Sequence, residues 1–371
     1  MVLCVHSELI FRCPSLLPVN ALASPLRRCL LTNKVLPRDL LVRFELVKRS
    51  NSVNSPTSSH LHLVPSGIIH PRFVVNSGTR GKGLWVTCWK EAVEALAKKG
   101  SYKRLNSSAY LDPAFATTRV HSHLARRVAQ ETEMFAERAK SWPARLDGDV
   151  QACPVRRVSR DELMSGRGSF PDSLQQHGAR PVAVLDLTVP EGGVVLSTLS
   201  HFTPFQLDDG QRRVPLYELA AFLARARLPP ARGPPAKTAG TDEAQPPPPQ
   251  PATKADVLRD EMQAHLQSVI ALWERRMARQ ARSRTSPPPP PSSPSPSTAS
   301  SDDLYVLYSP IIPLTPPPPP SPDSSTESSS SAPPSPPSTL AIRQAEDVVP
   351  LLLALKRCAL WLGEGWEAGS A

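Results

Sequence analysis

Apolar positions in the first part of the chain repeat with two periods, one typical of strands and one typical of helices. Residues 40–48 place apolar side chains at every second position on one face, which is typical of a half-buried strand. Short apolar runs at 61–64 and 84–87 predict two further strands. In residues 89–99 the apolar positions recur at helical spacing, and Gly100 follows where a helix end favours a left-handed residue. Together these patterns predict an α+β fold, a small antiparallel sheet of three strands with packed helices.

Longer patterns occupy the rest of the chain. Over Thr117 to Trp142, apolar side chains recur at steps of four or seven and predict a long helix. Pro181 to Thr188 is expected to form a strand, and Val214 to Ala226 a short helix. In Ala255 to Arg282, one apolar stripe predicts a helix that either docks on a protein partner or packs back on its own domain. Val348 to Leu362 predicts a further apolar helix, too short and too interrupted by charge for a membrane span.

Proline and serine dominate the segment from Pro229 to Pro337, which holds most of the 44 prolines. Such a composition buries too little apolar surface to offset the entropy of ordering the chain, so the segment is expected to be disordered or polyproline II apart from the helix at 255–282. Deleting Pro287 to Pro337 is therefore expected to leave the thermal stability unchanged. Five regions are expected in order: a leader at 1–25, a small folded domain at 26–105, a helical or mixed extension at 106–228, a disordered Pro/Ser-rich region at 229–340, and a short helical segment at 341–371.

Residues 1–25 contain a single acidic residue, Glu8, and are rich in leucine, serine and valine. An acidic-poor segment of this kind is typical of an organellar transit peptide, whereas Pro14 and Pro18 disfavour a secretory signal. Mitochondrial import is therefore expected. A cytoplasmic or nuclear location is the alternative, in which the same residues are an unstructured N-terminus.

The chain carries a formal net charge of +10, and the basic excess is concentrated between Pro71 and Lys140. A local basic field indicates a polyanion partner, with solubility alone as the alternative. The six cysteines are scattered without a close pair, which fits a reducing compartment and predicts neither a zinc site nor a redox motif. The sequence contains no phosphate-binding loop motif, nucleophile elbow or paired-carboxylate motif, so no enzyme, catalytic residue, metal or cofactor is predicted.

Three stretches carry a more specific signal: RRCLLTNKVLPRDLLVRF (Arg27 to Phe44), HLVPSGIIHPRF (His62 to Phe73) and RGKGLWVTCWKEAVEALAKKGSYKR (Arg80 to Arg104). In order, they contain an Arg-x-Cys opening, a Pro-x-x-x-Leu-x-Arg-Phe strand, a Val-Pro tract, a Gly-basic-Gly-x-aromatic-Val strand and a basic helix. This order resembles the YlxR family of small bacterial nucleic-acid-binding proteins. The resemblance covers about residues 26–105 and implies a YlxR-like domain with a structured RNA as its partner. Lys82 stands where the family more often has arginine, so its contact with phosphate is expected to be electrostatic rather than bidentate.

The resemblance and the charge pattern nominate three sets of residues for nucleic-acid contact: the loop Arg80, Gly81, Lys82 and Gly83; the arginines Arg27 and Arg43; and the helix exit Lys98, Lys99, Tyr102, Lys103 and Arg104. Glycines let a phosphate approach the backbone closely, and the cations supply charge. Tyr102 either stacks on an unpaired base or serves as a core anchor. Arg38 and Arg43 either contact phosphate or pair with Asp39 or Glu45, and the solvated or paired state is favoured for Arg38.

RNA binding is the leading hypothesis, with sequence-tolerant contacts between these basic residues and RNA phosphates in organellar RNA processing, transcription or translation. Trp85 and Trp89 are expected to lie in the core rather than to stack on bases. One alternative is an adaptor or scaffold that acts through the Pro/Ser-rich tract and its amphipathic helices. DNA binding in transcriptional control is a third hypothesis, and membrane insertion is not expected.

Overall fold

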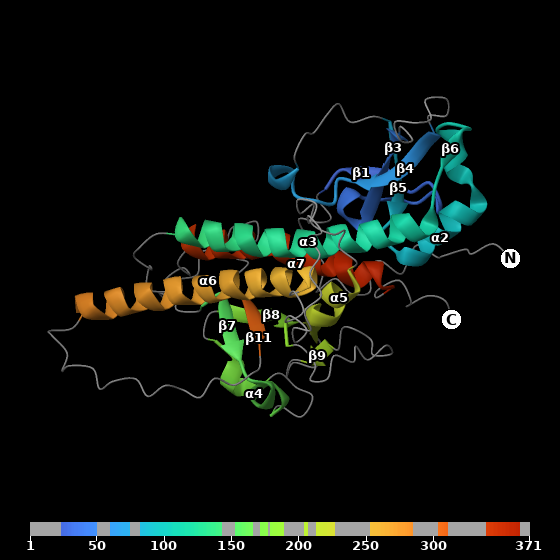
Figure 1. The fold of residues 1–371 in the computed structure, drawn as a ribbon. Helices are drawn as coiled ribbons and strands as arrows, with labels where there is room; N and C mark the ends of the chain where they lie inside the picture. The colour runs from blue at the N-terminus through green and yellow to red at the C-terminus, as the bar shows by residue number, and fades with distance from the viewer. Residues whose placement is uncertain are drawn as a thin grey trace, which may run out of the picture.

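Two β-sheets lie on either side of a layer of long helices (Figure 1). The computed structural model describes residues 24–49, 60–74, 82–142, 153–165, 171–176, 179–188, 204–206, 213–226, 253–284, 303–310 and 339–363. Within these residues the protein belongs to the α+β class, as predicted, with one small sheet of four strands and one mixed sheet of five. No helix in this described part has both the length and the apolar content that a membrane span requires.

The four-stranded sheet contains the three predicted strands. β3 (Leu41–Arg49), β4 (His60–Ser66) and β5 (Gly83–Thr87) pair antiparallel in the order β5-β3-β4. The sheet has one strand more than expected, because β6 (Ala109–Tyr110) pairs parallel with the far side of β4. A two-residue strand of this kind leaves no periodic pattern in the sequence, so only the pairing reveals it.

A short two-stranded ribbon precedes this sheet. β1 (Leu26–Arg28) pairs antiparallel with β2 (Val35–Pro37), and the 3-10 turn η2 (Arg38–Leu40) then leads directly into β3. Cys29 forms an isolated bridge with Trp85 of β5, which holds the ribbon against the edge of the sheet. The ribbon therefore brings the arginines on either side of it close to β3 and β5.

Helices cover one face of the four-stranded sheet. Val42 and Phe44 of β3 are fully buried and share one core with α2 (Lys90–Lys99) and α3 (Pro113–Lys140). The predicted end of α2 is confirmed at Gly100, whose φ of 63° is the left-handed conformation that favours glycine. Side chains alternate along a strand, so Arg43, which lies between Val42 and Phe44, points to the opposite face. Two 3-10 turns complete this part of the chain, η3 (Pro71–Phe73) and η4 (Ser101–Arg104).

The second sheet is mixed, with strand order β7-β11-β8-β10-β9. β11 runs antiparallel to both of its neighbours, whereas β10 runs parallel to β8. Its strands are β7 (Val155–Val158), β8 (Ala179–Asp186), β9 (Pro204–Gln206), β10 (Arg213–Glu218) and β11 (Leu304–Pro310). The strand expected at 181–188 is therefore confirmed as β8. Two short helical turns lie beside this sheet, α4 (Arg160–Met164) and η5 (Asp172–Leu174).

The segment Val214 to Ala226, expected to be one short helix, has two conformations. Its first half is strand β10, and only its second half is helical, as α5 (Leu219–Arg225). Pairing with β8 satisfies the backbone of β10 inside the sheet, and this long-range interaction outweighs the helical spacing of the local apolar residues. The helix prediction was therefore wrong for the first half of the segment.

Strand β11 lies inside the region that was expected to have no fixed fold apart from one helix. All residues from Leu304 to Tyr308 are buried. Leu304 and Val306 face one apolar cluster, and Tyr305 and Leu307 face the main core on the other side of the sheet. A strand that is buried on both faces forms an uninterrupted apolar run, and the sequence LYVLY is such a run.

This strand corrects two expectations. The first is that Pro229 to Pro337 lacks any fixed structure besides its helix, which is wrong at β11. The second is that deleting Pro287 to Pro337 leaves the stability unchanged, because that deletion would remove β11 from between β7 and β8. Apart from 253–284 and 303–310, the Pro/Ser-rich region lies outside the described residues.

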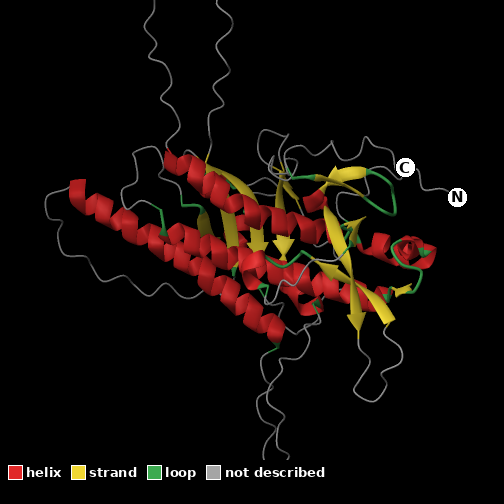
Figure 2. Cartoon of the chain, turned by 90° about the horizontal axis from the view of Figure 1, so that it is seen from above, coloured by secondary structure: helices red, strands yellow, loops and turns green. Residues whose placement is uncertain are grey.

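The layer between the sheets consists of α3, α6 (Lys254–Arg284) and α7 (Thr339–Trp361), and Figure 2 shows it from above. The helix predicted at 255–282 is confirmed as α6, and its apolar stripe is buried against the chain's own core: Met262, Leu266, Val269 and Trp273. The stripe therefore packs back on its own chain, the alternative to docking on a partner. One continuous core runs from Val42 to Trp361, so the expected boundaries between a small domain, an extension and a C-terminal segment do not divide the hydrophobic interior.

Candidate nucleic-acid interface

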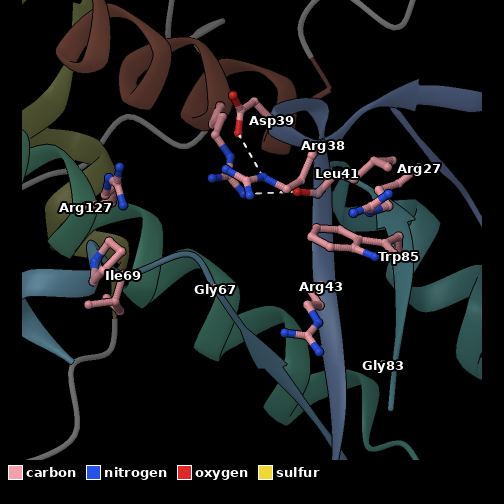
Figure 3. A pocket seen from close by; sticks show the side chains of 12 residues that line it. Arg27, Arg38, Asp39, Leu41, Arg43, Gly67, Ile69, Gly83, Trp85 and Arg127 are labelled. Carbon is pink, nitrogen blue, oxygen red and sulfur yellow. Dashed lines mark hydrogen bonds and ion pairs between the residues drawn. The ribbon is translucent and has the colours of Figure 1, made fainter. Parts of the chain in front are cut away.

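A hollow of about 420 Å³ opens beside β3, and residues of the sheet and of helices α3 and α7 line it (Figure 3). It is referred to below as the arginine hollow. Its lining residues are Arg27, Arg38, Asp39, Leu41, Arg43, Gly67, Ile69, Pro71, Gly83, Trp85, Arg127 and Arg357. A volume of this size is within the range of about 300–1,000 Å³ that is typical of small-ligand sites.

Five arginines from five different elements meet in the hollow. Arg27 comes from β1, Arg38 from η2, Arg43 from β3, Arg127 from α3 and Arg357 from α7. Among the lining residues, all of which the structure describes, Asp39 is the one acidic side chain. Clustered cations on walls of low dielectric constant focus the field, so the hollow attracts anions.

Arg43 lies on the outer face of β3, as the alternation of its strand predicts. Its Nη1 atom is 2.6 Å from Oε1 of Glu45, so the predicted alternative of an ion pair is confirmed while the side chain still lines the hollow. Gly83 of β5 lies directly against it. A Cβ atom placed on Gly83 would be 2.7 Å from the carbonyl oxygen of Phe44 and 3.0 Å from Nε of Arg43. Only glycine therefore allows β5 to approach β3 this closely beside the guanidinium group.

Substitution of Gly83 by alanine is expected to reduce both stability and anion binding. The added methyl group must displace either the backbone of β3 or the Arg43 side chain, at a cost of about 1–3 kcal/mol in the free energy of unfolding. Urea titration and RNA titration measure the two effects. Gly100→Ala is the matched control, because its Cβ would meet nothing within 4 Å and only its positive φ causes strain. The control should lose stability and keep its affinity for RNA, and an unchanged affinity in Gly83→Ala as well would contradict the role of this contact.

Arg127 is held in place by α3 and by the loop after β4. Its Nη2 is 2.7 Å from Oε1 of Glu131, and its Nη1 donates to the carbonyl oxygen of Ile68 at 3.3 Å. Burial lowers the pKa of Arg127, and the neighbouring Glu131 opposes this shift. Glu131 also faces Arg138, whose Nε lies 3.1 Å from Oδ1 of Asp347 on α7. This row of alternating charges attaches α7 to α3 and so helps to fix the helix that carries Arg357.

Arg357 is the deepest of the five arginines, with only 8% of its surface exposed. Its Nη2 donates to the carbonyl oxygen of Leu41 at 3.1 Å. Its Nε has no hydrogen-bond partner among the described residues. Buried donors are nearly always paired, so this nitrogen, on the wall of the hollow, is open to an acceptor atom from a ligand or from solvent.

The structure brings some of the predicted contact residues together and separates others. Arg27, Arg43 and Gly83 line the hollow, and the exposed Lys82 directly precedes Gly83. Arg80 and Gly81 lie outside the described residues. The predicted cations of the helix exit are exposed on α2 and η4 and are not part of the hollow: Lys98, Lys99, Lys103 and Arg104.

Two aromatic side chains near the predicted contacts have different outcomes. Tyr102 is only 6% exposed and belongs to the main core, so of its two predicted roles the core anchor is confirmed. Trp85, expected in the core, is half-buried and forms part of the wall of the hollow. The difference arises because Trp85 is on the outer face of β5, opposite Arg43 in the register, while Leu84 and Val86 face the core.

Arg127 and Arg357 were not predicted to belong to the site. Arg127 was one of several cations along a helix, and the sequence does not show which of them faces the sheet. Arg357 left one signal, a charge that interrupts the apolar run of residues 348–362. A buried charge in such a run needs a partner, and this requirement points to function only once the neighbouring elements are known.

Comparison with protein-family models, curated proteins and solved structures finds no match to this chain. A function is therefore inferred from the chemistry of the arginine hollow and from the sequence motifs to which some of its lining residues belong.

Proposed function

We propose that this protein binds RNA, and that the arginine hollow contacts RNA phosphates. The observation that supports this most strongly is the meeting of five arginines from five elements around one acidic side chain. Arginine presents a rigid fork of donors that matches phosphate oxygens, which makes it the preferred residue for phosphate recognition. Three of the residues nominated by the YlxR resemblance line the same hollow, namely Arg27, Arg43 and Gly83. The proposed role is binding without catalysis.

Charge reversal at the rim of the hollow is expected to weaken RNA binding strongly. Arg27 is exposed and the Arg38 side chain is 52% exposed, so a double change to glutamate should not disturb the core. Affinity for a single-stranded RNA should fall by about tenfold or more, and the slope of log affinity against log salt should flatten by about 0.7 for each lost phosphate contact. Fluorescence anisotropy at several salt concentrations measures both quantities, and circular dichroism checks the fold.

A matched control comes from α6. Replacing Arg275 and Arg279 with glutamate changes the net charge by the same amount at two exposed positions outside the hollow. We expect this variant to retain most of its affinity. Equal losses in both variants would indicate diffuse attraction without a defined site, and no loss in either would contradict RNA binding. Competition by duplex DNA in the same assay tests the alternative of DNA binding.

An adaptor role through the Pro/Ser-rich tract and its helices has less support, because the apolar stripe of α6 is buried against α3 and α5. The mitochondrial location remains a prediction from the composition of residues 1–25. Residues 1–23 lie outside the described part of the chain.

A further inference from the structure

We infer that the arginine hollow holds a phosphomonoester at an end of the RNA, together with the terminal nucleotide. This inference rests on the proposed RNA binding and makes it more specific. The hollow would then distinguish a phosphorylated RNA end from a hydroxyl end, and from the continuous phosphodiester backbone.

The ion pairs in the hollow leave two of its arginines without a carboxylate partner among the described residues. Arg43 and Arg127 each have a glutamate partner, at 2.6 Å and 2.7 Å. Arg27 and Arg357 instead donate to backbone carbonyl oxygens, and neither forms an ion pair within the described part of the chain. Two cations without a carboxylate partner in one hollow match a phosphomonoester, which carries about −1.5 to −2 charges at pH 7. A phosphodiester carries a single charge and leaves one of the two guanidinium groups uncompensated.

One hydrogen-bond donor on the wall of the hollow is open to a ligand. The Nε atom of Arg357 is buried and has no partner among the described residues, although the same side chain lines the hollow. An acceptor oxygen that reaches the inner wall would satisfy it. A terminal phosphate has three acceptor oxygens that can face different walls, which suits arginines that enter from different elements.

The arginines are distributed around the site. The sheet, the loop after β4 and the helices α3 and α7 all contribute to one hollow, and in Figure 3 Arg127 lies on the side opposite Arg43. Cations on different sides of a hollow can surround a terminal phosphate, whose three oxygens point in different directions. Figure 3 also shows the Trp85 ring between Arg27 and Arg43, where it offers an aromatic surface to the base that carries the phosphate.

The test compares three short RNAs of one sequence, with a 5′-phosphate, with a 3′-phosphate, and with hydroxyl groups at both ends. Titration of the full-length protein should show that one of the phosphorylated RNAs binds about tenfold tighter or more than the hydroxyl form, as expected for charge-assisted hydrogen bonds to one anion. The phosphorylated RNA that binds more tightly identifies which end of the RNA the protein recognises. Adenosine monophosphate should compete with the preferred RNA, and adenosine should not.

Two variants connect this preference to the hollow. Arg357→Met should remove the buried donor and so reduce the ratio of the affinity for the preferred phosphorylated RNA to the affinity for the hydroxyl RNA to about one. If this variant fails to fold, Arg27→Met should have the same effect at an exposed position. Arg279→Met, at an exposed position of α6 outside the hollow, is the control and should keep the full ratio. Equal binding of all three RNAs by the unmodified protein, with continued sensitivity to charge reversal at Arg27 and Arg38, would overturn the end-recognition inference and leave RNA binding intact. Absence of binding to every RNA would overturn the proposed function itself.

Discussion

Val306→Asp is expected to unfold the protein, although residue 306 lies in the Pro/Ser-rich region. Val306 is fully buried in β11, where it pairs with Arg156 of β7 and Val184 of β8. An isolated carboxylate at this position must be buried without a partner or be expelled with its strand, at a cost of roughly 5 kcal/mol or more. That cost is comparable to the total stability of a typical folded protein, about 5–15 kcal/mol. Thermal unfolding followed by far-ultraviolet circular dichroism measures the effect.

Two controls show whether the loss of stability comes from the charge buried in β11 or from a change elsewhere in the Pro/Ser-rich region. Val306→Ala should remain folded and lose about 1–3 kcal/mol, because it removes buried apolar surface without burying a charge. Deletion of residues 316–331, which lie outside the described part of the chain, should leave the melting temperature unchanged. A normal melting curve for Val306→Asp would show that β11 does not belong to the sheet, and the original expectation of a tract with no fixed fold apart from its helix would stand.

Trp361→Ala is expected to produce the second large loss, about 3–5 kcal/mol in the free energy of unfolding. Trp361 is 1% exposed and belongs to the main core, at the end of the helix that carries Arg357. The cavity left behind should loosen the last turn of α7, so RNA affinity should fall together with stability. Urea unfolding and RNA titration measure the two quantities.

The matched control for this variant is Val257→Ala on α6, where the side chain is 45% exposed. An exposed apolar residue contributes little, so its loss should change stability by no more than about 0.5 kcal/mol. A similarly small effect for Trp361→Ala would mean that α7 is dispensable for the core, and the position of Arg357 in the hollow would lose its structural basis.

Elements with a complete local period were predictable from the sequence. Strand β3, helix α2 with its end at Gly100, helix α3 and helix α6 all agree with the patterns that indicated them. In each of these elements the spacing of the apolar residues shows which face is buried, so the element can be predicted without knowing what packs against it. α7 was predicted from residue 348 onward but begins at Thr339.

Strand β11 could not be predicted in this way, because its apolar run is short and lies among proline-rich segments. Whether such a run is a strand depends on partners far along the chain, and β11 pairs with β7, whose residues precede it by about 150 positions. Composition averaged over the whole tract concealed this local exception. The same limit explains β10, whose pairing with β8 outweighed an apparent helical spacing.

The residues of the candidate site were predictable only where they belong to a recognisable sequence motif. Arg27, Arg43 and Gly83 were nominated from the resemblance and line the hollow. Arg127 and Arg357 depend on how two helices pack against the sheet, and the Arg357 donor and the Leu41 acceptor are 316 residues apart. Periodicity assigns a side chain to a face of its helix but does not show which other element that face meets.

The contact between Arg357 and Leu41 also has a consequence for the order in which the protein matures. The ribosome releases the first sheet long before it makes α7, so a nascent chain that already contains β3 and β5 still lacks the helix that covers part of its core and supplies the deepest arginine. Chains that stop early, through premature termination or proteolysis, would expose apolar surface and hold an incomplete hollow. A prematurely shortened chain that lacks α7 therefore lacks Arg357 and cannot complete the arginine hollow.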